Sequence, residues 1–203
     1  MEQHENQIIL RGDLLGLPEH SHENHGKSFC RFLLEVERLS GAVDTLPVVA
    51  QAELLEGLSL HPGLRLTVHG QVRSHNHTDM TGRHLMIFVF ACDIRIEDGE
   101  PVNEVTLTGL LCRQPTFRRT PLGREICDAM LAVPRAFRRA DYLPCILWGR
   151  TAQEISRCGV RDRVTIHGRL QSRIYTKYLD DVPTERTAYE VSALTAEAFP
   201  GEK

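Results

Sequence analysis

The chain has 203 residues, of which 41% are hydrophobic and 25% are charged, and its formal net charge is −3 at pH 7. This composition is typical of globular domains, excludes a chain that is disordered throughout, and leaves room for two domains of about 100 residues each. No apolar run approaches the roughly 18–20 residues that span a bilayer, and the opening MEQHENQ lacks the pattern of a signal peptide, so we expect a cytoplasmic protein without a membrane partner.

The net charge is divided unevenly along the chain. Residues 1–101 carry 8 Lys and Arg against 15 Asp and Glu, a net charge of −7, whereas residues 102–203 carry 16 against 12, a net charge of +4. A surface that binds nucleic acid needs basic side chains to neutralise phosphates. The second half is therefore the better candidate for such a surface.

The two halves of the chain are copies of one unit. At an offset of 97 residues they align without a gap from Asn6 to Pro47, and at an offset of 98 the segment 67–70 (TVHG) meets 165–168 (TIHG). The identical pairs include Asn6/Asn103, Gly12/Gly109, Pro18/Pro115, Cys30/Cys127, Arg38/Arg135 and Asp44/Asp141. Such a repeat indicates a duplicated gene segment with its boundary in the polar stretch 97–101. We expect two domains, residues 1–98 and 102–199.

Each half contains about five stretches of alternating apolar and polar residues, and this pattern predicts β-strands. In the second half the expected strands lie near 104–112, 124–135, 141–149, 162–175 and 186–197. Between the third and fourth strands, Thr151 and Glu154 fit a capping box, and Ala152, Ile155 and Cys158 form the apolar face of a short helix. This order is that of the OB fold. The predicted fold is all-β, with two tandem five-stranded OB-fold barrels, each with a short helix between strands 3 and 4.

Five segments of the second half form an ordered series: NEVTLTGLL (103–111), FRRTPLG (117–123), YLPCILWGRTAQEI (142–155), RVTIHGRLQSRIY (163–175) and AYEV (188–191). In this order and spacing they resemble the bacterial single-stranded DNA-binding protein (SSB) family. The resemblance implies an oligomeric protein that holds unpaired DNA in replication, recombination or repair. Because such assemblies present four OB folds, two per chain imply a homodimer. The family usually ends in an acidic tail that recruits other proteins, whereas this sequence stops at 199–203 (FPGEK), so we expect a member without that tail.

The resemblance also implies a binding site. The aromatic residues on which bases stack in the family fall on Phe137, Tyr142, Trp148 and Tyr175. The basic contacts fall on or near Arg118, Arg150, Arg169 and Arg173, to which neighbouring arginines add Arg119, Arg135, Arg138 and Arg139. Base stacking and phosphate contacts suit single-stranded DNA and RNA alike.

Side-chain alternation supports part of this site. On the third strand the residues expected to point into the barrel are Leu143, Cys145 and Leu147, and those expected to face outward are Tyr142, Ile146 and Trp148. On the fourth strand the inward set is Val164, Ile166, Gly168, Leu170 and Ile174, and the outward set is Arg169, Gln171, Arg173 and Tyr175. Three alternatives stay open: Trp148 packs under a loop or in an oligomer contact, the arginines form an ordinary charged edge, or Phe137 anchors its loop.

The first half keeps the strand pattern but lacks these aromatic residues. Its residues at or near the four aromatic positions are Ser40, Thr45, Gln51, and His75 or His77. With a net charge of −7, it should bind DNA weakly or not at all. We expect it to support oligomerisation, to stabilise the second half, or to contact another protein.

The reactive residue types indicate no metal, cofactor or catalytic site. The six cysteines contain no CxxC pair and lie mostly in apolar stretches, so we expect buried free thiols. Nine of the ten histidines lie in residues 1–101, where solvated loop residues are the simpler interpretation and metal ligands the alternative. Neither a nucleophile–base pair nor a glycine-rich phosphate loop is evident, so we expect no enzyme.

Two functional interpretations follow. The first is a single-stranded DNA-binding protein that acts by base stacking and phosphate contacts. The second is a protein–protein interaction module descended from the SSB family, similar to primosomal accessory proteins, with weak nucleic-acid binding. The missing tail favours the second, whereas the retained set from Trp148 to Tyr175 favours the first. A regulatory subunit of a nucleic-acid enzyme is a third.

Overall fold

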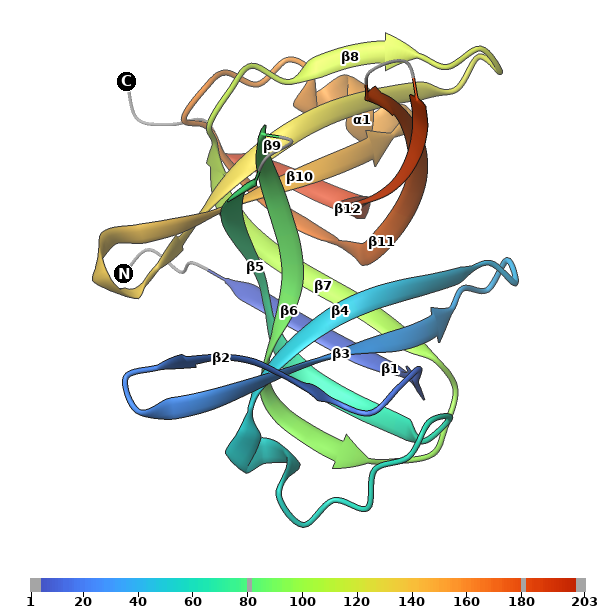
Figure 1. Ribbon diagram of the computed structural model, residues 1–203. Coiled ribbons are helices and arrows are strands. Elements are labelled where there is room, and N and C mark those ends of the chain that lie inside the picture. The colour runs from blue at the N-terminus through green and yellow to red at the C-terminus, as the bar shows by residue number, and fades with distance from the viewer. Residues whose placement is uncertain (1–4, 80–81, 180–181, 200–203) are drawn as a thin grey trace.

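The computed structural model describes residues 5–79, 82–179 and 182–199, which form twelve strands (Figure 1). The first half contains β1 (Asn6–Leu14), β2 (Glu19–Asn24), β3 (Lys27–Glu37), β4 (Val43–Gln51), the 3-10 helix η1 (Ala52–Leu55), β5 (Arg65–Asp79) and β6 (Gly82–Ile96). The second half contains β7 (Val102–Leu111), β8 (Thr116–Arg119), β9 (Glu125–Arg135), the 3-10 helix η2 (Ala136–Arg138), β10 (Arg139–Trp148), α1 (Gly149–Ile155), β11 (Arg163–Leu179) and β12 (Val182–Phe199). The expectations about the two ends of the chain rest largely on residues 1–4 and 200–203, which lie outside the described part.

The five long strands of each half pair in the same order. In the first half β1 pairs with β5, β5 with β6, β6 in parallel with β4, β4 with β3, and β3 with the end of β1. In the second half the order β7, β11, β12, β10, β9 returns to β7 in the same way. Each half is thus a closed five-stranded barrel, and the prediction of two tandem OB folds is confirmed.

Two local details differ from the expectation. The helix α1 begins directly after Trp148, so Thr151 lies inside it and makes no N-cap hydrogen bond. Of the predicted apolar face, Ala152 and Ile155 are buried in α1, whereas Cys158 lies beyond the end of the helix and is half-buried. In the first half the equivalent segment is the 3-10 helix η1. The short strands β2 and β8, which pair with β3 and β9, were not predicted.

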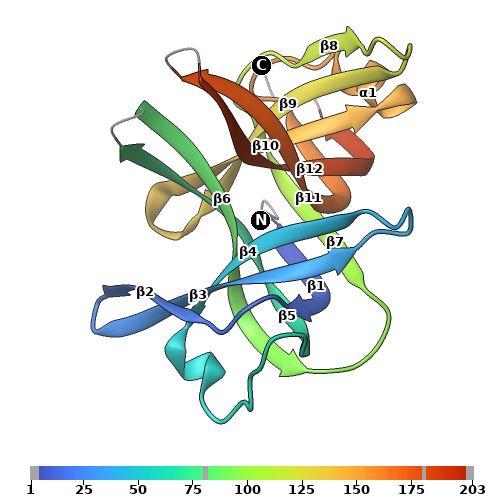
Figure 2. The same ribbon diagram turned by 45° about the vertical axis from the view of Figure 1, so that its right-hand side comes forward.

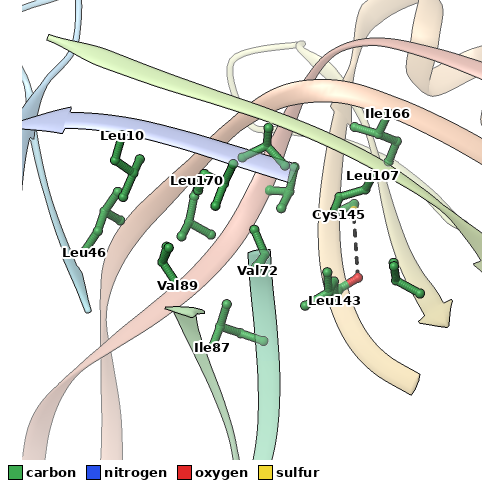
Figure 3. Packing of buried hydrophobic residues seen from close by; sticks show 14 of the residues in the cluster. Leu10, Leu46, Val72, Ile87, Val89, Leu107, Leu143, Cys145, Ile166 and Leu170 are labelled. Atoms are coloured by element: carbon green, nitrogen blue, oxygen red, sulfur yellow. Dashed lines mark hydrogen bonds between the residues drawn. The ribbon is translucent and has the colours of Figure 1, made fainter. Parts of the chain in front are cut away.

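A single buried hydrophobic cluster fills both barrels (Figure 3). The predicted inward residues of β10 belong to it, with Leu143 and Leu147 fully buried and Cys145 only 3% exposed. On β11, Val164, Ile166 and Leu170 are fully buried. Alternation within a strand therefore places the core side chains correctly wherever the strand belongs to the barrel.

The two barrels are joined through their first strands. β1 and β7 pair antiparallel from Asn6 opposite Leu107 to Arg11 opposite Val102, so that all twelve strands belong to one sheet. Next to this ladder the Asn6 side chain bonds both the N–H and the C=O of Val72, at 2.8 Å each. The repeat residue Asn103 does the same at Leu170. Each Asn thus replaces a ladder partner where β5 and β11 run past the joined strands.

Two buried aspartates hold each barrel to a strand of the other. Asp44 accepts hydrogen bonds from Arg38 of its own half and from the backbone N–H of Ser172 in the other half, the latter at 2.7 Å. Its repeat residue Asp141 accepts from the N–H of Ser74, also at 2.7 Å. Both aspartates have no exposed surface. The junction between the halves is consequently specific and polar at its two ends.

The cysteines are free thiols, but not all of them are buried as expected. Cys127 and Cys145 are buried, whereas Cys92 and Cys112 are exposed. Cys92 lies at the register shift between β5 and β6, and Cys112 follows the end of β7. Burial raises the pKa of the Cys127 thiol to about 11. In the described part of the chain, no helix is long and apolar enough to cross a membrane.

Candidate nucleic-acid interface

The outer face of β10 presents two aromatic side chains. Tyr142 is 46% exposed and Trp148 is 37% exposed, in agreement with the predicted alternation. The indole Nε1–H of Trp148 donates to Ser192 Oγ of β12 at 3.1 Å. This bond fixes the indole at the end of β10 while part of its surface stays open to solvent. Trp148 therefore does not lie buried under a loop.

Ile146 also lies on this outer face, as predicted, but it is covered. It is 7% exposed, although it is not part of the barrel cluster. Ser192 pairs with Ile146, so the hydrogen bond from Trp148 to Ser192 brings the indole beside Ile146. Alternation assigns a side chain to a face, whereas neighbouring side chains decide whether that face is covered.

The hairpin of β11 and β12 extends beyond its barrel (Figure 2). For this reason Ile174, predicted to point inward, is 68% exposed, since no core remains at its level of the strand. Gln171, predicted to face outward into solvent, is 8% exposed and donates to Glu190 of β12 at 2.9 Å. Tyr175 is 36% exposed, with the Arg173 guanidinium 5.7 Å from its ring centre.

The turn between β9 and β10 displays Phe137. This side chain is 94% exposed, so the alternative that it anchors its loop is wrong for the chain by itself. Phe137 and Arg138 both have left-handed backbone conformations, with φ of 60° and 56°. Such a conformation costs a residue other than glycine roughly 1–2 kcal/mol. Strain of this kind, at an exposed aromatic residue, marks a candidate contact.

The predicted arginines fall into three groups. Arg118, Arg119 and Arg150 form surface ion pairs with Asp128, Glu125 and Glu154, at 2.6, 2.8 and 2.8 Å. Arg138 and Arg139 are exposed on the β9–β10 turn next to Phe137, and Arg173 is exposed on β11. Arg135 and Arg169 are half-buried. The exposed arginines of the turn and of β11 are accessible to phosphates. The ion-paired arginines can bind a phosphate only if it replaces their carboxylate partner.

Arg118 illustrates this exchange. Its hydrogen bond to Asp128 raises the pKa of the guanidinium above its ordinary value. Exposed pairs of this kind contribute only about 0–1 kcal/mol, so a DNA phosphate can displace the carboxylate at little cost.

The register of the strands brings some of these residues together. Ser192 of β12 lies between Ile146 of β10 and Arg169 of β11. The strands β10 and β11, which carry predicted aromatic and basic residues, therefore lie on either side of the same short stretch of β12. The sequence alone placed them on separate strands.

The first half contributes groups that the sequence comparison missed. The backbone N–H of Tyr142 donates to Ser74 Oγ of β5 at 2.8 Å, so the first half lies directly beside a candidate stacking residue. His22 stacks on Phe29 with ring centres 4.7 Å apart, and Phe29 is 6.1 Å from Phe90. Comparison at equivalent positions could not find this aromatic group, because it comes from β2, β3 and β6 instead of β4 and β5.

The histidines of the first half do not form a recognisable metal site. His20, His22 and His25 lie on β2 and its turn, and His75 and His77 lie on β5. Within residues 5–79, 82–179 and 182–199, no group of three or more His, Cys, Asp or Glu is placed to hold a metal ion.

Comparisons with known proteins agree with this fold. Residues 102–199 match the model of the single-strand binding protein family. Single-stranded DNA-binding protein B of Bacillus subtilis is 36% identical over 80 residues, which cover 36% of this chain and 71% of the relative. The single-stranded DNA-binding protein of Bacillus cereus is 35% identical over 81 residues, which cover 36% of this chain and 48% of the relative.

A solved structure extends the likeness in fold to the first half. The wild-type single-stranded DNA-binding protein from Thermus aquaticus superposes with a TM-score of 0.80 at 23% identity, covering 100% of this chain and 96% of that one. This likeness concerns the fold alone. From the family match, the identity to the B. subtilis relative and the paired OB folds, the chain belongs to the single-strand binding protein family.

Proposed function

We propose that this protein binds single-stranded DNA through the outer face of its second barrel. The observation that carries the proposal is the set of exposed or part-exposed aromatic residues on that barrel: Phe137, Tyr142, Trp148 and Tyr175. Exposed aromatic side chains are costly unless they meet a partner, and bases stack on them with about 1–3 kcal/mol each. The net charge of +4 in this half supplies the attraction for phosphates.

The proposed mechanism is binding without chemical change. Bases stack on Trp148 and Tyr142 along β10, while Arg173 and the arginines of the β9–β10 turn meet phosphates on either side. Stacking needs unpaired bases, so the protein acts after a duplex has opened, in replication, recombination or repair. We place this activity in the cytoplasm. The family relationship and the two OB folds per chain support a homodimer as the working assembly.

The interaction-module alternative has less support. Its case rested on the end of the chain, whereas an exposed Phe137 in a strained backbone and a part-exposed Trp148 are features of a stacking surface.

Fluorescence of the single tryptophan tests the proposal. Binding of oligo-dT should quench Trp148, because a stacked base shares the indole face, and Trp148→Ala should weaken binding by roughly 1–3 kcal/mol with little loss of folding. The conservative variant Trp148→Phe, which keeps a stacking ring, should retain most of the affinity. Saturable binding with unchanged tryptophan emission would remove Trp148 from the site, and no binding at low salt would reject the function.

A further inference from the structure

A cavity of about 330 Å³ lies at the junction of the two barrels. Its walls come from β1 and β5 of the first half and from the end of β9 and η2 of the second, and its lining residues are Asn6, Gln71, Arg73, Pro134, Arg135 and Ala136. Phe137 follows Ala136 in the chain, and Ser74, which bonds Tyr142, follows Arg73. The cavity is thus adjacent to two of the proposed stacking residues.

The charge of this cavity is unbalanced. Arg73 and Arg135 each donate to the single buried carboxylate of Asp141, both at 3.3 Å, so two guanidinium groups share one negative charge. The Nε of Arg73 is buried and has no hydrogen-bond partner. Burial lowers the pKa of the Arg73 guanidinium, and the charge of Arg135 lowers it further. An anion that entered the cavity would relieve this repulsion.

The repeat provides an internal comparison. At the other junction Asp44 has one guanidinium partner, Arg38, with bonds of 2.6 and 2.5 Å. In the repeat, Gln171 occupies the position equivalent to Arg73. Glu37 occupies the position equivalent to Pro134. One arginine per aspartate is therefore enough to build the junction. The second arginine at Asp141 is additional charge.

The remaining positions do not restore an excess of positive charge at the Asp44 junction. Arg169 is the repeat equivalent of Gln71 and adds a positive charge. On the adjacent strand, however, Glu190 is the equivalent of Phe88 and adds a negative charge. Its carboxylate accepts a hydrogen bond from Gln171. The carboxylates of Asp44 and Glu190 thus equal in number the two arginines of that junction, although the Nε of Arg169, like that of Arg73, is buried without a hydrogen-bond partner. Only the Asp141 junction, which faces the β9–β10 turn, carries surplus positive charge.

We propose that this cavity binds a backbone phosphate of the DNA strand, so that the first half contributes Arg73 to the binding site. The proposal rests on the proposed function of the second barrel. A guanidinium matches a phosphate in charge and in the geometry of its paired donors. Arg73 also lies 5.7 Å from the ring centre of Phe90, which helps to hold the guanidinium in place.

The variant Arg73→Gln of the full chain tests the proposal, because it installs the residue found at the other junction. Asp141 keeps Arg135 and Ser74, so the fold should persist, which circular dichroism checks. The matched control is Arg95→Gln, which removes the same charge from the first half at an exposed ion pair with Asp93. We expect Arg73→Gln to weaken oligo-dT binding about tenfold. The slope of log affinity against log salt should become shallower by about 0.7, the value for one phosphate contact.

The outcomes separate the two proposals. If wild-type protein binds oligo-dT but Arg73→Gln matches Arg95→Gln in affinity and salt slope, the phosphate site is refuted and the proposed function stands. If wild-type protein does not bind, the function itself fails. If Arg73→Gln does not fold, Ala136→Glu places a carboxylate on the exposed wall of the cavity and should cause the same loss. Unchanged affinity of that variant would also refute the site.

Discussion

The buried Asp44 offers the sharpest test of how the two barrels are held together. Its carboxylate accepts two hydrogen bonds from Arg38 and two from Ser172, at 2.7 Å from the backbone N–H and 3.1 Å from the hydroxyl. In Asp44→Asn the side chain keeps its size but loses its charge, and its new N–H₂ group faces donors. Arg38 is then left without a counter-ion.

The expected loss follows from this geometry. Removing one partner of a fully buried ion pair costs about 3–5 kcal/mol. Because the Arg38 side chain is 23% exposed and reaches water, we expect about 3 kcal/mol, near the lower end of that range. Urea unfolding followed by circular dichroism at pH 7 measures the change. The matched control is Asp93→Asn, whose partner Arg95 is mostly exposed, and there we expect less than about 1 kcal/mol.

Acid pH provides a second readout of the same contact. Burial by itself raises the pKa of Asp44, but the hydrogen bonds from Arg38 and Ser172 outweigh it, and the pKa lies below its ordinary value. A depressed pKa contributes stability above the pKa of the unfolded state, about 3.9, which is lost as the pH falls through the folded value. The difference in the free energy of unfolding between wild type and Asp44→Asn should therefore become smaller below about pH 4. A variant within about 0.5 kcal/mol of wild type at pH 7 would refute this account, because surface substitutions alone change stability by that much.

Two further predictions concern the turn and the halves. Phe137→Gly should raise the free energy of unfolding by about 1 kcal/mol, because glycine adopts a φ of 60° without strain. The same variant should weaken oligo-dT binding. Equal loss of stability and affinity would show that the ring has a structural role. Residues 102–203 produced alone expose the edge of β7, which in the full chain pairs with its own repeat β1. We expect this fragment to form a dimer through β7, with Ser172 of one copy meeting Asp141 of the other as Ser74 does in the full chain; a folded monomer in light scattering would refute this.

Much of the fold followed from the order of residues alone. The alternation of Leu143, Cys145 and Leu147 predicted the inner face of β10, and the offset of 97 residues predicted two copies of one barrel. These patterns are local or repeated, so they need no knowledge of what packs against them. The outward orientation of Tyr142 and Trp148 followed from the same alternation.

Other features depended on contacts between distant residues. Ile174 has the alternation of a core residue, yet it is exposed because β11 outruns its barrel, and Gln171 is covered because Glu190 meets it across the hairpin. The left-handed backbone of Phe137 has no local sign such as glycine. Arg73 and Asp141 are separated by 68 residues and belong to different barrels, so only the pairing of β1 with β7 brings them together. A strand pattern states which way a side chain points, whereas the partner it meets there is decided by how the strands close and join.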